Sequence, residues 1–106
     1  MRYPKSVRRE LRLLASTAYE RELGNALEEL YLSFTEWKDK KIDCFELNQL
    51  IHEFHQKKSR ELWNIYNQPD DEFNVVRAVR LGVLQPEEIS EQTAEAIQLD
   101  RRSHIE

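Results

Sequence analysis

Residues 5–37 contain a single residue that disfavours a helix, Gly24. Apolar side chains recur through this segment every three or four residues, which is the period of an amphipathic helix. They form two stripes displaced by one residue: Val7, Leu11, Leu14 and Ala18 in the first, and Tyr19, Leu23, Leu27, Leu30, Phe34 and Trp37 in the second. We therefore expect either one long helix with a gentle bend or two helices that meet near Gly24.

The composition extends this helical prediction to the whole chain. Only two glycines and three prolines occur among 106 residues, and alternating strand patterns are almost absent. Such a balance favours long helices over sheets rich in turns. We expect one all-α domain over residues 1–106, a compact bundle of four or five helices joined by short connections.

A second long helix is predicted over about residues 44–67, and we expect it to be the central helix of the bundle. Asp43 can accept the backbone N–H of Glu46, whose side chain can reach back, as in a capping box. Pro69 stops the helix. An alternative is a break at Lys57 and Lys58, with Ser59 capping a separate helix.

Two shorter helical segments are expected after Pro69. Asp70 opens the first, which ends before Gly82. Pro86 stands where a proline in the first turn belongs, so the second covers roughly residues 86–102. Residues 100–106 are expected to form a loosely docked tail.

The helix over residues 44–67 has an unusually wide apolar side. On a wheel of about 100° per residue, one stripe forms the predicted core face: Leu47, Leu50, Ile51, Phe54, Leu62 and Ile65. Beside it lies a flank of aromatic and polar side chains, Phe45, His52, His55, Ser59, Trp63 and Tyr66, with Arg60 among the charged residues of the far side. The flank nearly doubles the usual apolar width. Either a neighbouring helix covers it, or it is a site or an oligomer interface.

The two histidines of this flank do not form a known catalytic motif. In HEFH at residues 52–55 the second histidine comes three residues after the first, whereas the zinc protease motif requires four, and position 56 is Gln. A third metal ligand would have to come from another helix. We predict no catalytic residue, no metal and no cofactor, and both a structural and a functional role stay open for His52 and His55.

Charge and cysteine content limit the partners and the compartment. The formal net charge is −4, and five basic residues cluster within residues 1–12. Because the rest of the chain is acidic, we expect no nucleic-acid binding. Cys44 is a lone cysteine, and no apolar run has the length of a signal peptide or a membrane span. We therefore expect a cytoplasmic protein without a membrane partner.

The stretch IHEFHQKKSRELWNIYNQPDDEFNVVRAVRLGVL resembles small bacterial helical proteins of unassigned function, and the similarity covers about residues 23–89. The resemblance attaches no chemistry to the motif. It implies that His52, His55, Arg60 and Tyr66 act together.

Two functional hypotheses follow from these patterns. The first is a non-enzymatic interaction or regulatory protein whose candidate contact residues bind another protein or a second copy as a homodimer: His52, His55, Ser59, Arg60, Trp63 and Tyr66. The second is a small enzyme, or a binder of a phosphate or metal ligand, that uses His52, His55 and Arg60. We favour the first, because active sites usually gather polar groups from several elements, and here all candidates lie on one helix.

Overall fold

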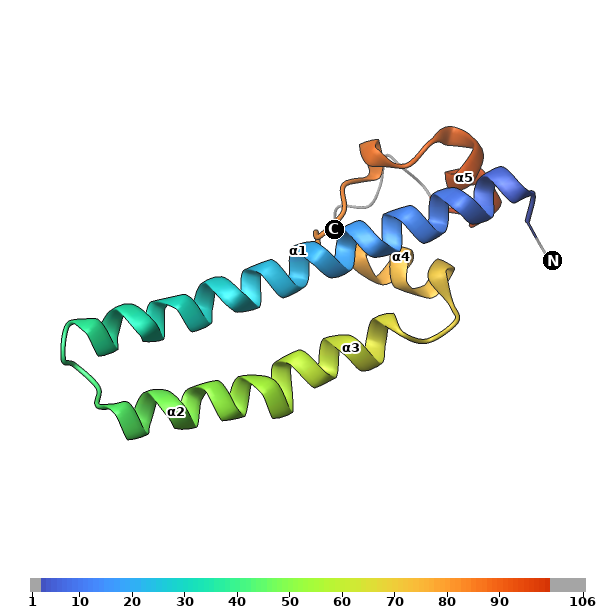
Figure 1. Cartoon of the computed structure of the whole chain (residues 1–106). Coiled ribbons are helices and arrows are strands. Elements are labelled where there is room, and N and C mark those ends of the chain that lie inside the picture. The colour runs from blue at the N-terminus through green and yellow to red at the C-terminus, as the bar shows by residue number, and fades with distance from the viewer. Residues whose placement is uncertain (1–2, 100–106) are drawn as a thin grey trace.

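A computed structural model describes residues 3–99, and these residues form helices joined by turns (Figure 1). The long helix α1 spans Lys5–Lys38. The chain then turns back through α2 (Cys44–Glu53), the π-helical turn η1 (Phe54–Ser59) and α3 (Arg60–Tyr66). It continues with α4 (Asp71–Arg80), the 3-10 turn η2 (Pro86–Glu88) and α5 (Glu91–Ala96). The predicted all-α bundle is confirmed.

The molecule has two parts, which we call the hairpin and the base. In the hairpin, the second half of α1 lies antiparallel to an arm made of α2, η1 and α3 (Figure 1). In the base, the first half of α1 packs against α4 and α5. The hairpin extends well beyond the base, and the longest dimension is 53 Å. Because α1 contacts α2, η1, α3, α4 and α5, the central helix is α1 and not the predicted helix over residues 44–67.

Helix α1 is one helix from Lys5 to Lys38, which settles the alternative that the sequence left open. Nothing lies within 4 Å of where a side chain at Gly24 would be. The displacement between its two apolar stripes marks a change of packing partner. The first stripe belongs to the base, and the second belongs to the hairpin.

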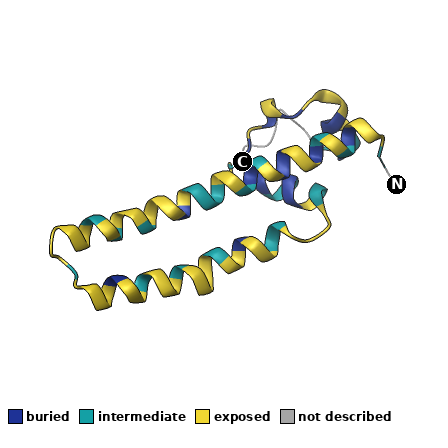
Figure 2. Cartoon of the chain, viewed as in Figure 1, coloured by how far each residue is buried: buried dark blue, intermediate teal, exposed yellow. Residues whose placement is uncertain are grey.

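The base holds the main hydrophobic core. Its buried side chains come from α1, α4 and the C-terminal segment: Val7, Leu11, Leu14, Ala15, Ala18, Val75, Ala78, Val79, Leu84, Ile89, Ala94 and Ile97. Figure 2 shows the buried residues concentrated here, whereas the hairpin is mostly exposed. In the hairpin, Ala26, Leu47 and Leu62 are buried. The hairpin thus has a thin seam rather than a core of its own.

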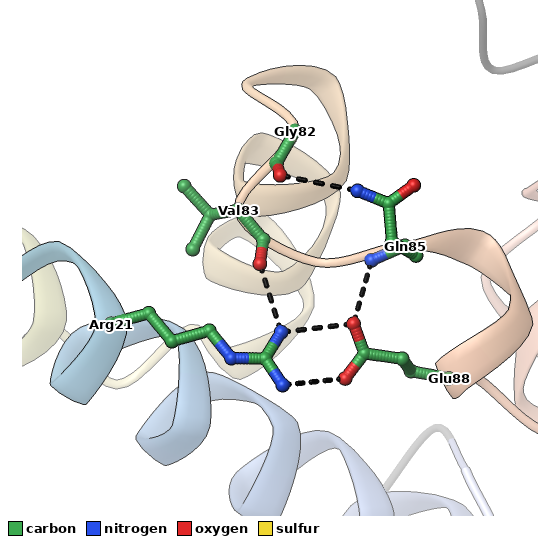
Figure 3. Close-up of polar contacts among 5 residues, drawn as sticks. All are labelled: Arg21, Gly82, Val83, Gln85 and Glu88. Carbon is green, nitrogen blue, oxygen red and sulfur yellow. Dashed lines mark hydrogen bonds and ion pairs between the residues drawn. The ribbon is translucent and has the colours of Figure 1, made fainter.

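An ion pair joins the base to the start of the hairpin (Figure 3). The Arg21 guanidinium donates to both carboxylate oxygens of Glu88, at 2.8 and 2.9 Å, and to the backbone carbonyl of Val83 at 2.9 Å. Glu88 also accepts the backbone N–H of Gln85 at 2.9 Å. Two parallel hydrogen bonds between an arginine and a carboxylate fix geometry better than a single contact does. They hold η2 against α1.

The predicted helix starts at Asp43 and Asp70 are confirmed, and the helix predicted to start at Pro86 is wrong. Asp43 and Glu46 form the capping box at the start of α2, with hydrogen bonds of 2.8 and 2.9 Å. The Asp70 carboxylate accepts the backbone N–H of Phe73 at the start of α4. Pro86 opens only a 3-10 turn, and a separate helix follows at residues 91–96, so the continuous helix over 86–102 is corrected. Residues 100–106 lie outside the described part.

The second long helix changes its winding at Phe54–Ser59, where the structure has a π-turn. A π-turn closes hydrogen bonds from residue i to i+5 and so accommodates one extra residue. Leu47 and Phe54, seven residues apart, lie on the inner side of the arm. A regular helix would bring Glu61 there next, but the π-turn brings Leu62, which is 1% exposed.

The structure corrects two predictions about the 44–67 segment. The segment is not one uniform α-helix, so the wheel misplaces every residue after Phe54 by about one position. The predicted core face is also thinner than expected, because Ile51 is exposed and Leu50, Phe54 and Ile65 are only half-buried.

Candidate functional site

One side of the hairpin carries apolar side chains that no other element within residues 3–99 covers. In an antiparallel helix pair, residues turned in the same sense away from the contact line lie on the same side of the pair. On α1 the buried Ala26 is followed by Leu27. On the arm the half-buried Phe54 is followed by His55, and the buried Leu62 by Trp63. Leu27, His55 and Trp63 therefore share one side of the hairpin.

We call this side the hairpin face and define it by six residues: Leu27, Tyr31, Phe34, Ile51, His55 and Trp63. Neighbours on α1 are three or four residues apart, as a continuous stripe requires. On the arm Ile51 and His55 are four apart, and Ser59 stands between His55 and Trp63. The side chains are open to solvent, with 47% of Leu27, 61% of Tyr31 and 57% of Trp63 exposed. The face carries neither a carboxylate nor an ammonium group. Of the flank predicted on residues 44–67, His55 and Trp63 belong to this face.

The base lies on the other side of α1 and leaves the hairpin face open. Ala18, fully buried in the base, and Leu27 are nine residues apart. At about 100° per residue the two point in opposite directions. The buried Leu11 and Val7 are turned away from Leu27 in the same way. The tertiary structure therefore uses one side of α1 for the base and leaves the other side free.

A hollow of about 320 Å³ lies at the arm's end of this face, lined by His55, Ser59, Arg60, Trp63 and Asn64. All five residues come from η1 and α3. Within residues 3–99, the side chains of His55, Ser59, Arg60 and Trp63 make no hydrogen bond or ion pair with another residue. The hollow thus offers an imidazole, a hydroxyl, a guanidinium and an indole N–H. A donor-rich set of this kind suits an oxyanion, above all a carboxylate or phosphate that can pair with the arginine.

The structure brings together four of the six predicted site residues and separates the other two. His55, Ser59, Arg60 and Trp63 line the hollow. His52 lies outside it, and its Nε2 is 3.3 Å from the side-chain amide nitrogen of the exposed Gln56. Tyr66 is turned inward, toward α1. Because of the π-turn, the predicted alignment of Tyr66 with the histidines is wrong.

Tyr66 instead belongs to a half-buried cluster between α1, α3 and α4. Its ring stacks on Tyr19, and its hydroxyl donates a hydrogen bond to the Glu22 carboxylate. Arg77 donates to the same carboxylate at 2.7 Å, and its guanidinium carbon lies 5.9 Å from the centre of the Tyr66 ring. Sequence reasoning missed Tyr19, Glu22 and Arg77. The position of Tyr19 at the junction of the two stripes was the one local signal.

The charges of this cluster are strongly coupled. Burial by itself would raise the pKa of Glu22, but hydrogen bonds from Arg77 and Tyr66, together with the positive charge of Arg77, hold that pKa below its ordinary value. Burial and the neighbouring Glu22 carboxylate raise the pKa of Tyr66. The phenol therefore stays protonated and remains a donor. The cluster fixes where the hairpin leaves the base.

Other candidate chemistry finds little support in the described region. Among residues 3–99, no three His, Cys, Asp or Glu side chains gather closely enough to hold a metal ion. Cys44 is exposed at the hairpin tip, where its sulfur accepts the indole N–H of Trp37 at 3.4 Å. No helix within this region has the length and apolar character that crossing a membrane requires. Two further residues lie outside the described part: Arg2, which belongs to the basic cluster within residues 1–12, and His104, the third histidine of the sequence.

No protein-family model matches this chain, and the searches of curated proteins and of solved structures return no significant match. The resemblance of residues 23–89 to small bacterial helical proteins therefore stays a prediction.

Proposed function

We propose that this chain is a non-enzymatic interaction protein of the bacterial cytoplasm that self-associates through its hairpin face. The observation that carries the proposal is an open apolar face on two helices, on the side of α1 that the base leaves free. Large exposed apolar patches on soluble proteins mark interaction sites. The lone exposed cysteine fits a reducing compartment.

The alternative, an enzyme or a binder of phosphate or metal ligands on His52, His55 and Arg60, has less support. The hollow contains His55 and Arg60, but His52 lies outside it. The hollow is also lined by one helical arm alone, whereas catalytic groups usually converge from several elements.

Sedimentation of matched variants tests the proposal. Leu27 and Leu32 are both exposed leucines of α1, at 47% and 60%, but they are turned about 140° apart. We expect Leu27→Glu and Trp63→Glu to lower the sedimenting mass to that of one chain, because each places a carboxylate on the hairpin face. Leu32→Glu should leave the mass unchanged. A wild-type chain that sediments as a monomer at every concentration contradicts the proposal, and so does a Leu32→Glu variant that dissociates as completely as Leu27→Glu.

A further inference from the structure

The hairpin face has two unlike halves, and each half complements the other. The α1 half is apolar, with Leu27 and Phe34 along it. The exposed carboxylates of Glu20 and Glu28 lie at the outer edge of α1, away from the arm, where they line a second hollow with Gly82 and Val83. The arm half contains the donor-rich hollow around Arg60. A surface that contains both a group and its complement can pair with a copy of itself through a twofold axis.

The heights of these groups along the hairpin also match. Tyr66 stacks on Tyr19, and Trp37 contacts Cys44, so these two contacts fix the position of α1 along the arm at both ends of the hairpin. Arg60 precedes Tyr66 by six residues, about 9 Å along the helix axis, which places it beside about residue 25 of α1. A twofold axis parallel to the hairpin keeps every residue at its own height. Arg60 of one copy then lies within about one turn of Glu28 of the other, a distance that the two long side chains can span, and Glu20 lies about one and a half turns away in the opposite direction.

The area of the face is sufficient for such a pair. Two helices of about 20 residues are about 30 Å long and, packed 8–10 Å apart, present a face of about 600 Å². Two copies together bury about 1,200 Å², which is the lower end of the range for specific stable interfaces. The bases do not obstruct this contact, because they lie on the opposite side of α1.

We propose that the partner on the hairpin face is a second copy of this chain, with α1 of each copy lying along the α2–α3 arm of the other, so that Glu28 reaches Arg60 in the hollow. This inference rests on the proposed function and adds the arrangement. The product is a four-helix bundle with antiparallel neighbours and both bases at the same end. In the alternative arrangement, α1 packs on α1 and the arm packs on the arm. The two donor-rich hollows would then face each other without an acceptor.

A charge exchange tests the contact. Arg60→Glu alone and the double variant Glu20→Arg with Glu28→Arg should each raise the dimer dissociation constant tenfold or more, since like charges then meet at both ends of the twofold contact. Mixed in equal amounts, the two variants should form a heterodimer about as tight as the wild-type dimer, because opposite charges meet again at both contacts. Circular dichroism checks that the exposed substitutions leave the fold intact.

Cross-linking through Cys44, the single cysteine of the chain, tests the orientation. With both bases at one end, the two hairpin tips lie side by side, and a short bifunctional maleimide should join the wild-type chains in high yield. In the opposite orientation the two cysteines lie on the order of 30 Å apart, and the same reagent should fail.

The outcomes distinguish a failure of this dimer arrangement from a failure of the proposed interaction function. A wild-type dimer that Leu27→Glu dissociates, but that neither cross-links through Cys44 nor responds to Arg60→Glu, overturns the arrangement and leaves the interaction function standing. A wild-type chain that is monomeric at every concentration overturns both. A hollow that binds inorganic phosphate in a monomeric chain also overturns both and supports the ligand-binding alternative.

Discussion

The ring of Tyr66 lies flat on the ring of Tyr19, with ring centres 4.8 Å apart and planes 8° from parallel. Tyr19 belongs to α1 and Tyr66 to the arm, and both lie next to the junction of the hairpin with the base. The stack fixes the position of the arm along α1. The Glu22 carboxylate accepts the hydrogen bond of the Tyr66 hydroxyl and holds it in place. Stacked aromatic pairs contribute about 0.5–1.5 kcal/mol beyond the area that they bury.

The Tyr66 hydroxyl should contribute measurably to stability. Tyr66→Phe keeps the stacked ring but removes the donor to Glu22, so we expect the free energy of unfolding to fall by about 1.5 kcal/mol, as for hydrogen bonds to charged groups. Urea denaturation followed by circular dichroism measures this change. Tyr31→Phe, at a residue that is 61% exposed, is the matched control and should change stability little. Equal effects of the two substitutions would contradict the assigned role.

Glu22 should make the stability depend on pH in the acidic range. Its pKa is lower in the folded protein than its ordinary value of 4.5, so its contribution is fully present above that value. The contribution is lost as the pH falls through 4.5 and then through the folded-state pKa. Glu22→Gln should therefore be less stable than the wild type near neutral pH, and this difference should shrink between about pH 5 and pH 3.

Chemical denaturation at several pH values measures that difference. Glu10 and Glu88 also have lowered pKa values, so the wild-type curve contains their contributions as well, and the comparison uses the difference between the two proteins. Arg77→Met should reduce the pH dependence that Glu22 contributes, because it removes the hydrogen bonds and the positive charge that lower its pKa. A difference between wild type and Glu22→Gln that is constant with pH would contradict the lowered pKa.

The π-turn should tolerate the loss of one residue. Deleting the exposed Lys57 allows Phe54–Ser59 to rewind as a regular α-helix while Leu62 and Tyr66 keep facing α1. We expect the melting temperature to stay within a few degrees of the wild type or to rise. Deleting Gln49 from α2 should lower it clearly, because it rotates Leu47 relative to Phe54. A large loss of stability on deletion of Lys57 would show that the π-turn itself is needed for folding.

Two buried polar residues of the base should respond in opposite ways to apolar substitution. Asn74 is fully buried, and among residues 3–99 its side-chain amide finds no hydrogen-bond partner. Asn74→Leu should therefore raise the free energy of unfolding by about 1 kcal/mol or more. Thr93, equally buried, donates to the Glu10 carboxylate at 2.6 Å, so Thr93→Val should lower it by a similar amount. Calorimetric melting of the two variants measures the sign of each change in the free energy of unfolding. Destabilisation by both substitutions would contradict the assignment for Asn74.

Local features of the fold could be predicted from the sequence. The capping box of Asp43 and Glu46 and the carboxylate cap of Asp70 act within four residues, so the side chains that form them are visible in the sequence. The same holds for the two stripes of α1, and Leu27 and Phe34 of the second stripe lie on the hairpin face. Four of the five residues that line the hollow could also be predicted, because four-residue spacing brings His55, Ser59 and Trp63 together on any nearly helical path.

The tertiary structure alone decided which side chains of the arm face inward and which side of α1 stays uncovered by the base. Tyr66 meets Glu22 across 44 positions and Arg77 across 11, and no local spacing encodes either contact. The π-turn arises because packing Leu62 into the seam, in place of the charged Glu61, outweighs regular winding over one turn. The base covers one side of α1 and leaves Leu27, Tyr31 and Phe34 in solvent, because α4 and α5 are too short to cover both. Burial depends on which segments meet after the chain turns back, and helical periodicity does not specify that.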